Sequence, residues 1–212
     1  PVNPRLLSRI ATGGTGTHRN FYSGGDRAYL AANMAGYTGN ILMIMDVSDP
    51  TQPVEVGRWH APGQWHAAGE STEHHAFFHG PIYLVDDLAY APFGRAGVAV
   101  LDLSDETAPT RIGKVDIGDF GSVIGVHSVL PLPERGIAIA STEAILEDQP
   151  DPANLVFTID ISDPSKPKPL AVFPTPVPPE QMGIGDFSEL GGKFGPHNLH
   201  LPHDQAHLAP VD

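Results

Sequence analysis

The 212-residue chain contains 23 Gly and 22 Pro, and only 17% of its residues are charged, a composition that favours short strands and tight turns over long helices. Its net charge of -13 leaves no basic stripe for a phosphate backbone, so we expect no nucleic-acid partner and no attraction to anionic membranes. No apolar run is long enough to span a bilayer, and the lack of cysteine excludes disulfides and thiolate metal sites. We therefore expect a soluble all-β protein in which any metal is held by His, carboxylate or carbonyl groups.

A strand-like run that closes on an acidic turn occurs three times along the chain. The copies are NILMIMDVSDPTQP (40–53), GVAVLDLSDETAP (97–109) and NLVFTIDISDPSKP (154–167). The β-branched and large apolar residues predict a strand buried on both faces, and the Asp and Ser that follow can bond the turn backbone. Because Asp46, Asp102 and Asp160 recur so regularly, we interpret them as turn formers rather than catalytic groups.

Each copy is flanked by further strand-like segments. One precedes it, at RAYLAA (27–32), LAYAPF (88–93) and GIAIAS (136–141), and one follows it, at VEVGRW (54–59), TRIGKV (110–115) and KPLAVF (168–173). A segment headed by a histidine comes first in each unit. Four strands per unit at regular spacing are typical of β-propeller blades, and helix is expected only in loops, near 142–148.

The predicted blade units are approximately 16–60, 77–116 and 125–174, with a fourth, incomplete unit at 195–212. Because a propeller closes to protect its edges, we expect residues 1–212 to be a partial propeller domain of about three and a half blades. The remaining blades of the ring, for which we expect seven in total, would come from the rest of the chain or from a second chain.

Four histidines lie in register across these units. They are His18, His79, His127 and His197. The first three each lie ten residues before corresponding positions of the second strand, Ala28, Ala89 and Ile137, and the fourth shares a Gly-x-His context. Corresponding residues of successive inner strands converge on a propeller axis, so we predict that the four imidazoles bind a metal there.

Iron is the ion we expect, with Cu, Zn and Mn as alternatives, because imidazole ligands suit such metals and an all-His site leaves positions open for substrate or dioxygen. A structural role remains an alternative, in which each histidine caps its blade by bonding a neighbouring backbone carbonyl. In a second alternative, His74 or His75 takes the place of His79.

Other residues near these histidines are candidates for catalysis and substrate binding. Glu143 follows the second strand of the third unit and could offset the charge of the metal or act as a base, or it could be a solvated loop carboxylate. Arg19, Asn20 and Asn198 adjoin the histidines and could orient a substrate or bond the neighbouring blade. The aromatic residues expected to wall a substrate pocket are Phe21, Tyr22, Phe78 and Phe194.

The repeated strand and turn, ILMIMDVSDP (41–50), VAVLDLSD (98–105) and VFTIDISDP (156–164), resembles the LVIVD-repeat family of β-propellers, and the likeness covers nearly the whole chain. Segments such as GTHRNFY (16–22) and GVHSVLPLP (125–133) are similar to a bacterial subgroup of that family. The second unit lacks the usual proline after Asp105, which puts that turn alone in doubt.

Carotenoid-cleaving oxygenases hold iron on four histidines at a propeller axis, and selenium-binding-type propellers also place histidines near theirs; this chain is similar to them in that pattern only. The pattern implies a metal-dependent oxidoreductase or oxygenase acting on a small organic substrate. The alternatives are a hydrolase or lyase that uses the same metal with Glu143 as base, and a non-catalytic propeller that binds a protein on its acidic surface.

Overall fold

The computed structural model describes residues 3–71, 77–117, 123–150 and 155–200. Blade 1 contains β1 (Gly13–Phe21), β2 (Arg27–Met34), β3 (Asn40–Asp46) and β4 (Val54–Trp59). Blade 2 contains β5 (Tyr83–Val85), β6 (Leu88–Pro92), β7 (Val98–Asp102) and β8 (Thr110–Val115). Blade 3 contains β9 (Val126–Leu132), β10 (Ile137–Thr142), β11 (Val156–Asp160) and β12 (Lys168–Val172).

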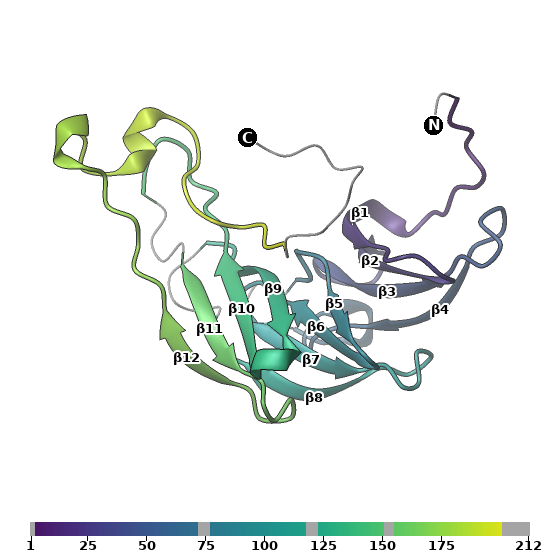
Figure 1. Cartoon of the computed structure of the whole chain (residues 1–212). Helices are drawn as coiled ribbons and strands as arrows, with labels where there is room; N and C mark the ends of the chain where they lie inside the picture. The colour runs from purple at the N-terminus through teal and green to yellow at the C-terminus, as the bar shows by residue number, and fades with distance from the viewer. Residues whose placement is uncertain (1–2, 72–76, 118–122, 151–154, 201–212) are drawn as a thin grey trace.

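Each blade is a four-stranded antiparallel sheet whose strands pair in chain order. The three sheets stand side by side in an arc, with β1, β5 and β9 toward its inside and β4, β8 and β12 toward its outside (Figure 1). The all-β class is confirmed, and the arrangement fits a β-propeller. Residues 195–200 of the expected fourth unit contain no strand, and 201–212 lie outside the described residues.

The described helices are all short 3₁₀ turns: η1 (His66–Ala68), η2 (Pro133–Arg135), η3 (Glu180–Met182) and η4 (Phe187–Leu190). The helix expected near 142–148 is wrong, because β10 runs to Thr142 and the backbone beyond it is irregular. None of the described helices has the length and hydropathy that crossing a membrane requires.

The acidic turns form as the sequence predicts. In all three blades, the aspartate that ends the third strand accepts a hydrogen bond from the backbone N–H two residues later, at 2.9 Å for Asp46, 2.8 Å for Asp102 and 2.9 Å for Asp160. These hydrogen bonds from serines lower the pKa of all three carboxyls. The interpretation of these aspartates as turn formers is confirmed.

The hydrophobic core lies between the blades. Leu42 and Ile44 of β3 are buried against Ala89 and Leu101 of blade 2. On the other face of blade 2, Val100 packs with the buried residues of blade 3, such as Phe157 and Ile159. Because β3 and β7 are buried on both faces, their apolar runs have the continuous rather than alternating pattern of interior strands.

Neighbouring blades also meet along their outer strands, where a glycine faces a turn carbonyl. The backbone of Gly57 in β4 lies so close to the carbonyl oxygen of Glu106 that an added Cβ would overlap it, and Gly113 in β8 meets the carbonyl of Pro164 in the same way. Glu106 and Pro164 occupy the same position of the acidic turn in blades 2 and 3. A residue without a side chain is therefore required wherever an outer strand receives the turn of the next blade.

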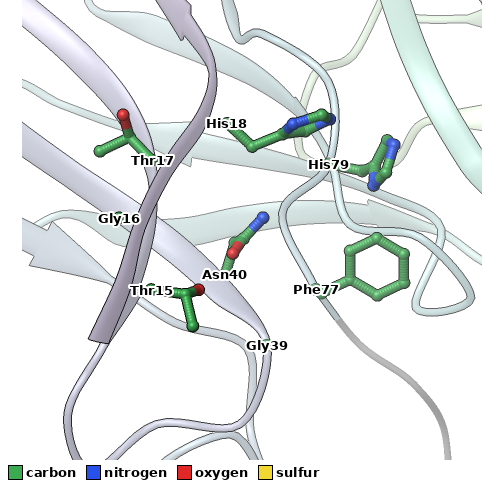
Figure 2. A pocket seen from close by; sticks show the side chains of 8 residues that line it. All are labelled: Thr15, Gly16, Thr17, His18, Gly39, Asn40, Phe77 and His79. Carbon is green, nitrogen blue, oxygen red and sulfur yellow. The ribbon is translucent and has the colours of Figure 1, made fainter.

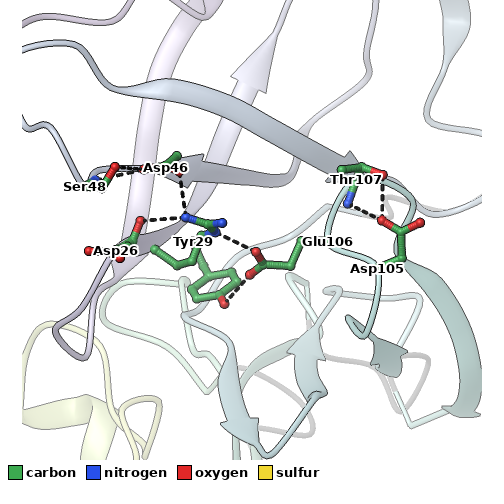
Figure 3. Close-up of polar contacts among 8 residues, drawn as sticks. Asp26, Tyr29, Asp46, Ser48, Asp105, Glu106 and Thr107 are labelled. Carbon is green, nitrogen blue, oxygen red and sulfur yellow. Dashed lines mark hydrogen bonds and ion pairs between the residues drawn. The ribbon is translucent and has the colours of Figure 1, made fainter.

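A polar cluster reinforces the contact between blades 1 and 2 (Figure 3). Arg27 Nε donates to Glu106 Oε2 at 2.6 Å, and Nη1 of the same guanidinium donates to Asp46 Oδ2 at 2.9 Å. The Tyr29 hydroxyl donates to the other oxygen of Glu106 at 2.9 Å, and burial together with this bond raises the pKa of Tyr29 to about 12. Glu106, which replaces the proline of the other two turns, therefore ties its turn to blade 1.

The glycine contacts predict a destabilising effect of a single methyl group. Gly113→Ala would place a Cβ against the carbonyl of Pro164, and overpacking of this kind costs about 1–3 kcal/mol. Lys114→Ala, one residue later on the same strand, should change stability by less than about 0.5 kcal/mol. Urea unfolding measures both free energies, and equal midpoints for the two variants would contradict the proposed tight contact.

Candidate metal centre

The four in-register histidines lie in one row along the inside of the blades. Adjacent ring centroids are 4.8 Å apart for His18 and His79, for His79 and His127, and for His127 and His197. His18 belongs to β1 and His127 to β9, whereas His79 precedes β5 and His197 lies in the segment after η4. Each ring thus comes from a different repeat unit, and the structure brings together the residues that the repeat alignment singled out.

A β-bulge sets the position of His127. In the pairing of β9 with β10, Ser128 lies opposite Ser141 and Val126 opposite Thr142, so His127 is an extra residue without a partner. The strand pairing also corrects the predicted equivalence of the second strands. Judged by pairing with the third strand, Ala138 and not Ile137 is the equivalent of Ala28 and Ala89. Ser128 lies ten residues before Ala138 and would therefore hold the position of His18 and His79 in a regular strand. The extra residue of the bulge directs His127 toward the row instead.

A second bulge follows His18. The register of β1 shifts between His18 and Phe21, and Arg19 has φ of 37°, a left-handed conformation that is uncommon for a residue with a side chain. Nη2 of Arg19 lies 3.5 Å from Nε2 of His197. The irregular backbone therefore directs a guanidinium toward the far end of the histidine row.

The tautomer of His127 follows from its neighbours. Nδ1 of His127 lies 2.8 Å from the hydroxyl oxygen of Ser128, and that hydroxyl donates its hydrogen to the carbonyl of His197 at 2.5 Å. Since the hydroxyl has only one hydrogen, its oxygen accepts from Nδ1–H, and the lone pair of the ring is on Nε2. This Nε2 is buried and has no hydrogen-bond partner, and such a nitrogen is available to a metal.

Glu143 supplies a carboxylate next to these rings. Its Oε2 is 2.9 Å from Nε2 of His79 and 3.9 Å from Nε2 of His127, and its side chain is only 17% exposed. The ligand atoms of His79, His127 and Glu143 all lie within 4.8 Å of one another. The alternative of a solvated loop carboxylate is therefore wrong, and the carboxylate lies together with the two rings.

The electrostatics favour neutral rings beside one negative charge. Burial, and next the proximity of His79, lowers the pKa of His127 to about 3, and the same two causes lower the pKa of His18. Burial acts to raise the pKa of Glu143, but the hydrogen bond with His79 and the neighbouring histidines outweigh it, so this pKa lies below its usual range. Near neutral pH, His18 and His127 are thus uncharged and Glu143 is ionised, which are the protonation states of metal ligands.

A pocket of about 430 Å³ adjoins the row at its blade 1 end (Figure 2). Its lining contains no Asp, Glu, Lys or Arg and consists of Thr15, Gly16, Thr17, His18, Gly39, Asn40, Phe77 and His79. His18 and His79 therefore border both the pocket and the histidine row, so that a small molecule in the pocket would touch the row directly.

The prediction that Phe78 walls the pocket is wrong, because Phe78 is fully buried and stacks on Phe93 at a ring distance of 5.3 Å. Successive side chains of an extended segment point in opposite directions, so Phe77 shares the side of His79 and Phe78 faces the core. The Phe77 and His79 ring centroids lie 5.0 Å apart.

The other predicted substrate-binding residues are divided between the row and the surface. The Asn198 amide donates to Nε2 of His197 at 3.0 Å, so this side chain does reach the row. Asn20 instead bonds Thr17 at 3.1 Å, and Tyr22 is 61% exposed with its hydroxyl bonded to the carbonyl of Gly25. Two further aromatic residues pack elsewhere: Phe21 against Tyr29 and Tyr83, and Phe194 on Phe187 at 4.5 Å.

The remaining described histidines lie apart from the row. His60 contacts the rings of Tyr37 and Trp65, His66 lies in η1 near Thr38, and His200 is exposed. His74 and His75, the alternatives to His79, lie outside the described residues, as do His203 and His207.

Comparison with known families identifies the repeat. The LVIVD repeat model matches residues 25–60 and 151–171, which include β2 to β4 of blade 1 and β11 with most of β12 of blade 3. The chain contains LVIVD repeats. A search of curated proteins found no significant match. All four histidines of the row lie outside the matched segments, so the match accounts for the blades of this LVIVD-repeat protein and not for its candidate metal centre.

Two features of the centre escaped the sequence reasoning. Ser128, whose hydroxyl orients His127 and also holds the carbonyl of His197, gave no signal beyond being next to a candidate ligand. Gly80 was also missed: its backbone lies against the carbonyl of His127, where a Cβ would overlap, so the segment of His79 packs directly on that of His127.

The opposite orientations of two adjacent aromatic residues can be tested in this LVIVD-repeat protein. Phe78→Ala should lower the free energy of unfolding by about 3–5 kcal/mol, because it removes a fully buried ring. Phe77→Ala should cost no more than about 1 kcal/mol, since its ring borders the pocket. Chemical denaturation distinguishes them, and a larger loss for Phe77→Ala would show that the orientations are reversed.

Proposed function

We propose that this LVIVD-repeat protein is a metal-dependent oxidoreductase that binds a transition metal ion at His79, His127 and Glu143 and acts on a small organic substrate in the adjoining pocket. The observation that carries the proposal is the buried Nε2 of His127, which has a lone pair and no hydrogen-bond partner. Leaving such a nitrogen unpaired costs stability, and coordination of a metal offsets that cost.

The donor set supports iron. Two imidazoles and one carboxylate with further positions open are the ligands of non-haem iron oxygenases, and the ion would supply redox chemistry here. Copper and manganese remain alternatives. In this proposal Glu143 is a metal ligand, rather than only a nearby carboxylate as the sequence predicted. Its negative charge would offset part of the charge of the ion.

The outer histidines extend the proposed centre on both sides. The ring of His18 is 4.8 Å from that of His79, and the ring of His197 is 4.8 Å from that of His127. His18 would complete the coordination or contact the substrate, because it also borders the pocket, whereas Nε2 of His197 accepts a hydrogen bond from Asn198. Arg19, directed toward His197, would orient an anionic group of a substrate.

The proposed pocket chemistry follows from its lining. The hydroxyls of Thr15 and Thr17 and the amide of Asn40 can bond an uncharged polar group, while Phe77 offers an aromatic face. His79 and Glu143 bond each other at 2.9 Å, and both would hold an ion in their deprotonated forms.

Zinc would change the proposal to a hydrolase or lyase, because a His₂Glu set is also typical of catalytic zinc. In that case the metal would act as a Lewis acid, and Glu143, as a ligand, would not be free to serve as the base. A folded protein that binds no metal would instead favour a non-catalytic propeller whose net charge of -13 suits a basic partner.

Metal content tests the ligand assignment. His79→Ala, His127→Ala and Glu143→Ala should each reduce affinity by more than the ~10–100-fold that follows loss of a supporting hydrogen bond. His60→Ala, outside the row, should leave the metal content stoichiometric. Elemental analysis of purified protein gives the stoichiometry, circular dichroism verifies folding, and full metal occupancy in both His79→Ala and His127→Ala would refute the site.

The orientation of His127 gives a second test. Ser128→Ala removes the acceptor for Nδ1–H and should weaken metal binding about 10–100-fold. Ser141→Ala is the matched control, because its hydroxyl bonds the same carbonyl of His197, at 3.2 Å, in a hydrogen bond that does not involve the ring of His127. Titration of each variant with Fe(II) measures the affinities, and equal affinities in the two variants would show that Ser128 does not orient the ligand.

A further inference from the structure

The side chain of Arg19 reaches across the histidine row. Arg19 follows His18 in β1, and Nη2 of its guanidinium lies 3.5 Å from Nε2 of His197 at the other end of the row. Burial is the main cause that lowers the pKa of His18 and the pKa of His127, and the positive charge of Arg19 contributes to both. The guanidinium therefore acts on the two ends of the row and on its centre.

The charge of this guanidinium is not balanced by an acidic side chain. Arg27 and Arg58 each pair with carboxylates, whereas no ion pair among the described residues includes Arg19. The hydrogen-bond contact of Arg19 is with Nε2 of His197, a nitrogen that also accepts from the Asn198 amide and so carries no hydrogen. Because this ring offers no negative charge, the N–H groups of the guanidinium are available to an anion.

The backbone of Arg19 also points to a functional role. Among the described residues other than glycine, only Arg19, Asp86 and Asp148 have a positive φ, and aspartate adopts this conformation more readily than arginine. Strained backbone of this kind is concentrated at binding and catalytic sites. The strained conformation directs the side chain of Arg19 to the row and not to the surface of blade 1.

The surroundings favour a carboxylate over a phosphate group. The planar fork of a guanidinium matches the two oxygens of a carboxylate. Glu143 is ionised near neutral pH and lies beside His79 and His127, so the site already holds one negative charge. A phosphate dianion would be repelled by Glu143 more strongly than a carboxylate, with the same single guanidinium to offset the repulsion.

The pocket at the blade 1 end of the row defines the remainder of the ligand (Figure 2). Its lining contains no Asp, Glu, Lys or Arg, so it suits an uncharged group. The ring of Phe77 offers a face on which an aromatic group stacks. The side chains of Thr15, Thr17 and Asn40 offer hydrogen bonds to a hydroxyl on that group.

The pocket and the guanidinium are separated along the row. His79 borders the pocket, and two ring separations of 4.8 Å, from His79 to His127 and from His127 to His197, lie between it and the ring that Arg19 contacts. A molecule that occupies the pocket and also reaches Arg19 must therefore be elongated. It must also pass the proposed metal ligands, where it would react.

We propose that the substrate is an elongated aromatic carboxylic acid whose carboxylate binds Arg19 and the amide of Asn198, while its aromatic end lies beside Phe77. The assignment rests on the proposed function, because it names the substrate of the same site, but binding of the carboxylate requires no metal. His197 is then a positioning residue, since its Nε2 holds the guanidinium and the amide side by side.

Isothermal titration calorimetry of the metal-free protein tests the role of the charge. The probes are 4-hydroxycinnamate and its uncharged amide, 4-hydroxycinnamamide. Arg19→Gln should weaken binding of the acid about 10-fold or more, as expected for lost hydrogen bonds to a charged group, and leave binding of the amide unchanged. Arg111→Gln removes the same charge from an exposed position of β8 and should change neither. No measurable binding of the acid, or an equal loss in the two variants, would overturn the proposal.

The other end of the ligand is tested by Phe77→Ala, which should weaken binding of the acid and of the amide by the same factor. Unchanged binding of both probes would overturn the placement in the pocket. Competition with simple anions tests the carboxylate itself: acetate should displace 4-hydroxycinnamate at least as well as inorganic phosphate does, and the opposite order would overturn the choice of a carboxylate. Circular dichroism verifies the folding of each variant.

Elemental analysis after addition of Fe(II) separates this proposal from the proposed function. Stoichiometric iron in a protein that binds the acid no better than the amide would overturn the carboxylate site alone. Binding of the acid that depends on Arg19, in a protein that takes up no metal, would refute the proposed function and support the carboxylate site.

Discussion

The distance between neighbouring blades is the constraint on which the rest of the structure depends. At the outside of the arc, Gly57 and Gly113 allow the turn of the next blade to approach the strand backbone. At the inside, Gly80 allows the segment of His79 to lie against the carbonyl of His127. The packing of blade 1 on blade 2 and of blade 2 on blade 3 brings His18, His79 and His127 to the same ring separation of 4.8 Å. A wider spacing would give isolated histidines and no centre.

Much of the fold could be predicted because it follows from local chemistry repeated three times. Apolar runs such as Ile41–Met45 indicate strands covered on both faces, and the aspartates beyond them form the same turn in each blade. The substitution of Glu106 for proline, which left one turn in doubt, changes no strand and adds a contact to Arg27. Repetition thus compensates for the weakness of each single signal.

The details of the candidate centre were less predictable, because they depend on shifts of one residue. The bulge at His127 has no signature in the sequence, so the repeat alignment placed Ile137 instead of Ala138 at the position of Ala28 and Ala89. Side chains alternate in direction along an extended segment, and this alternation places Phe77 toward the pocket and Phe78 toward the core. The sequence does not show which of the two points inward, because both residues precede the start of β5. The contact of Glu143 with His79 could not be predicted from the sequence, because the two residues meet only when blades 2 and 3 pack together.

The proposed ligands are distributed over two separate blades: His79 precedes the first strand of blade 2, while His127 lies in β9 and Glu143 follows β10 of blade 3. An ion held by all three would act as a non-covalent cross-link between blades that share no backbone hydrogen-bond ladder beyond the isolated bridge of Gly94 with Val126 in the described chain. In a protein without cysteine, this is the role that a disulfide has in other small domains. Chemistry and mechanical cohesion would then depend on the same three side chains.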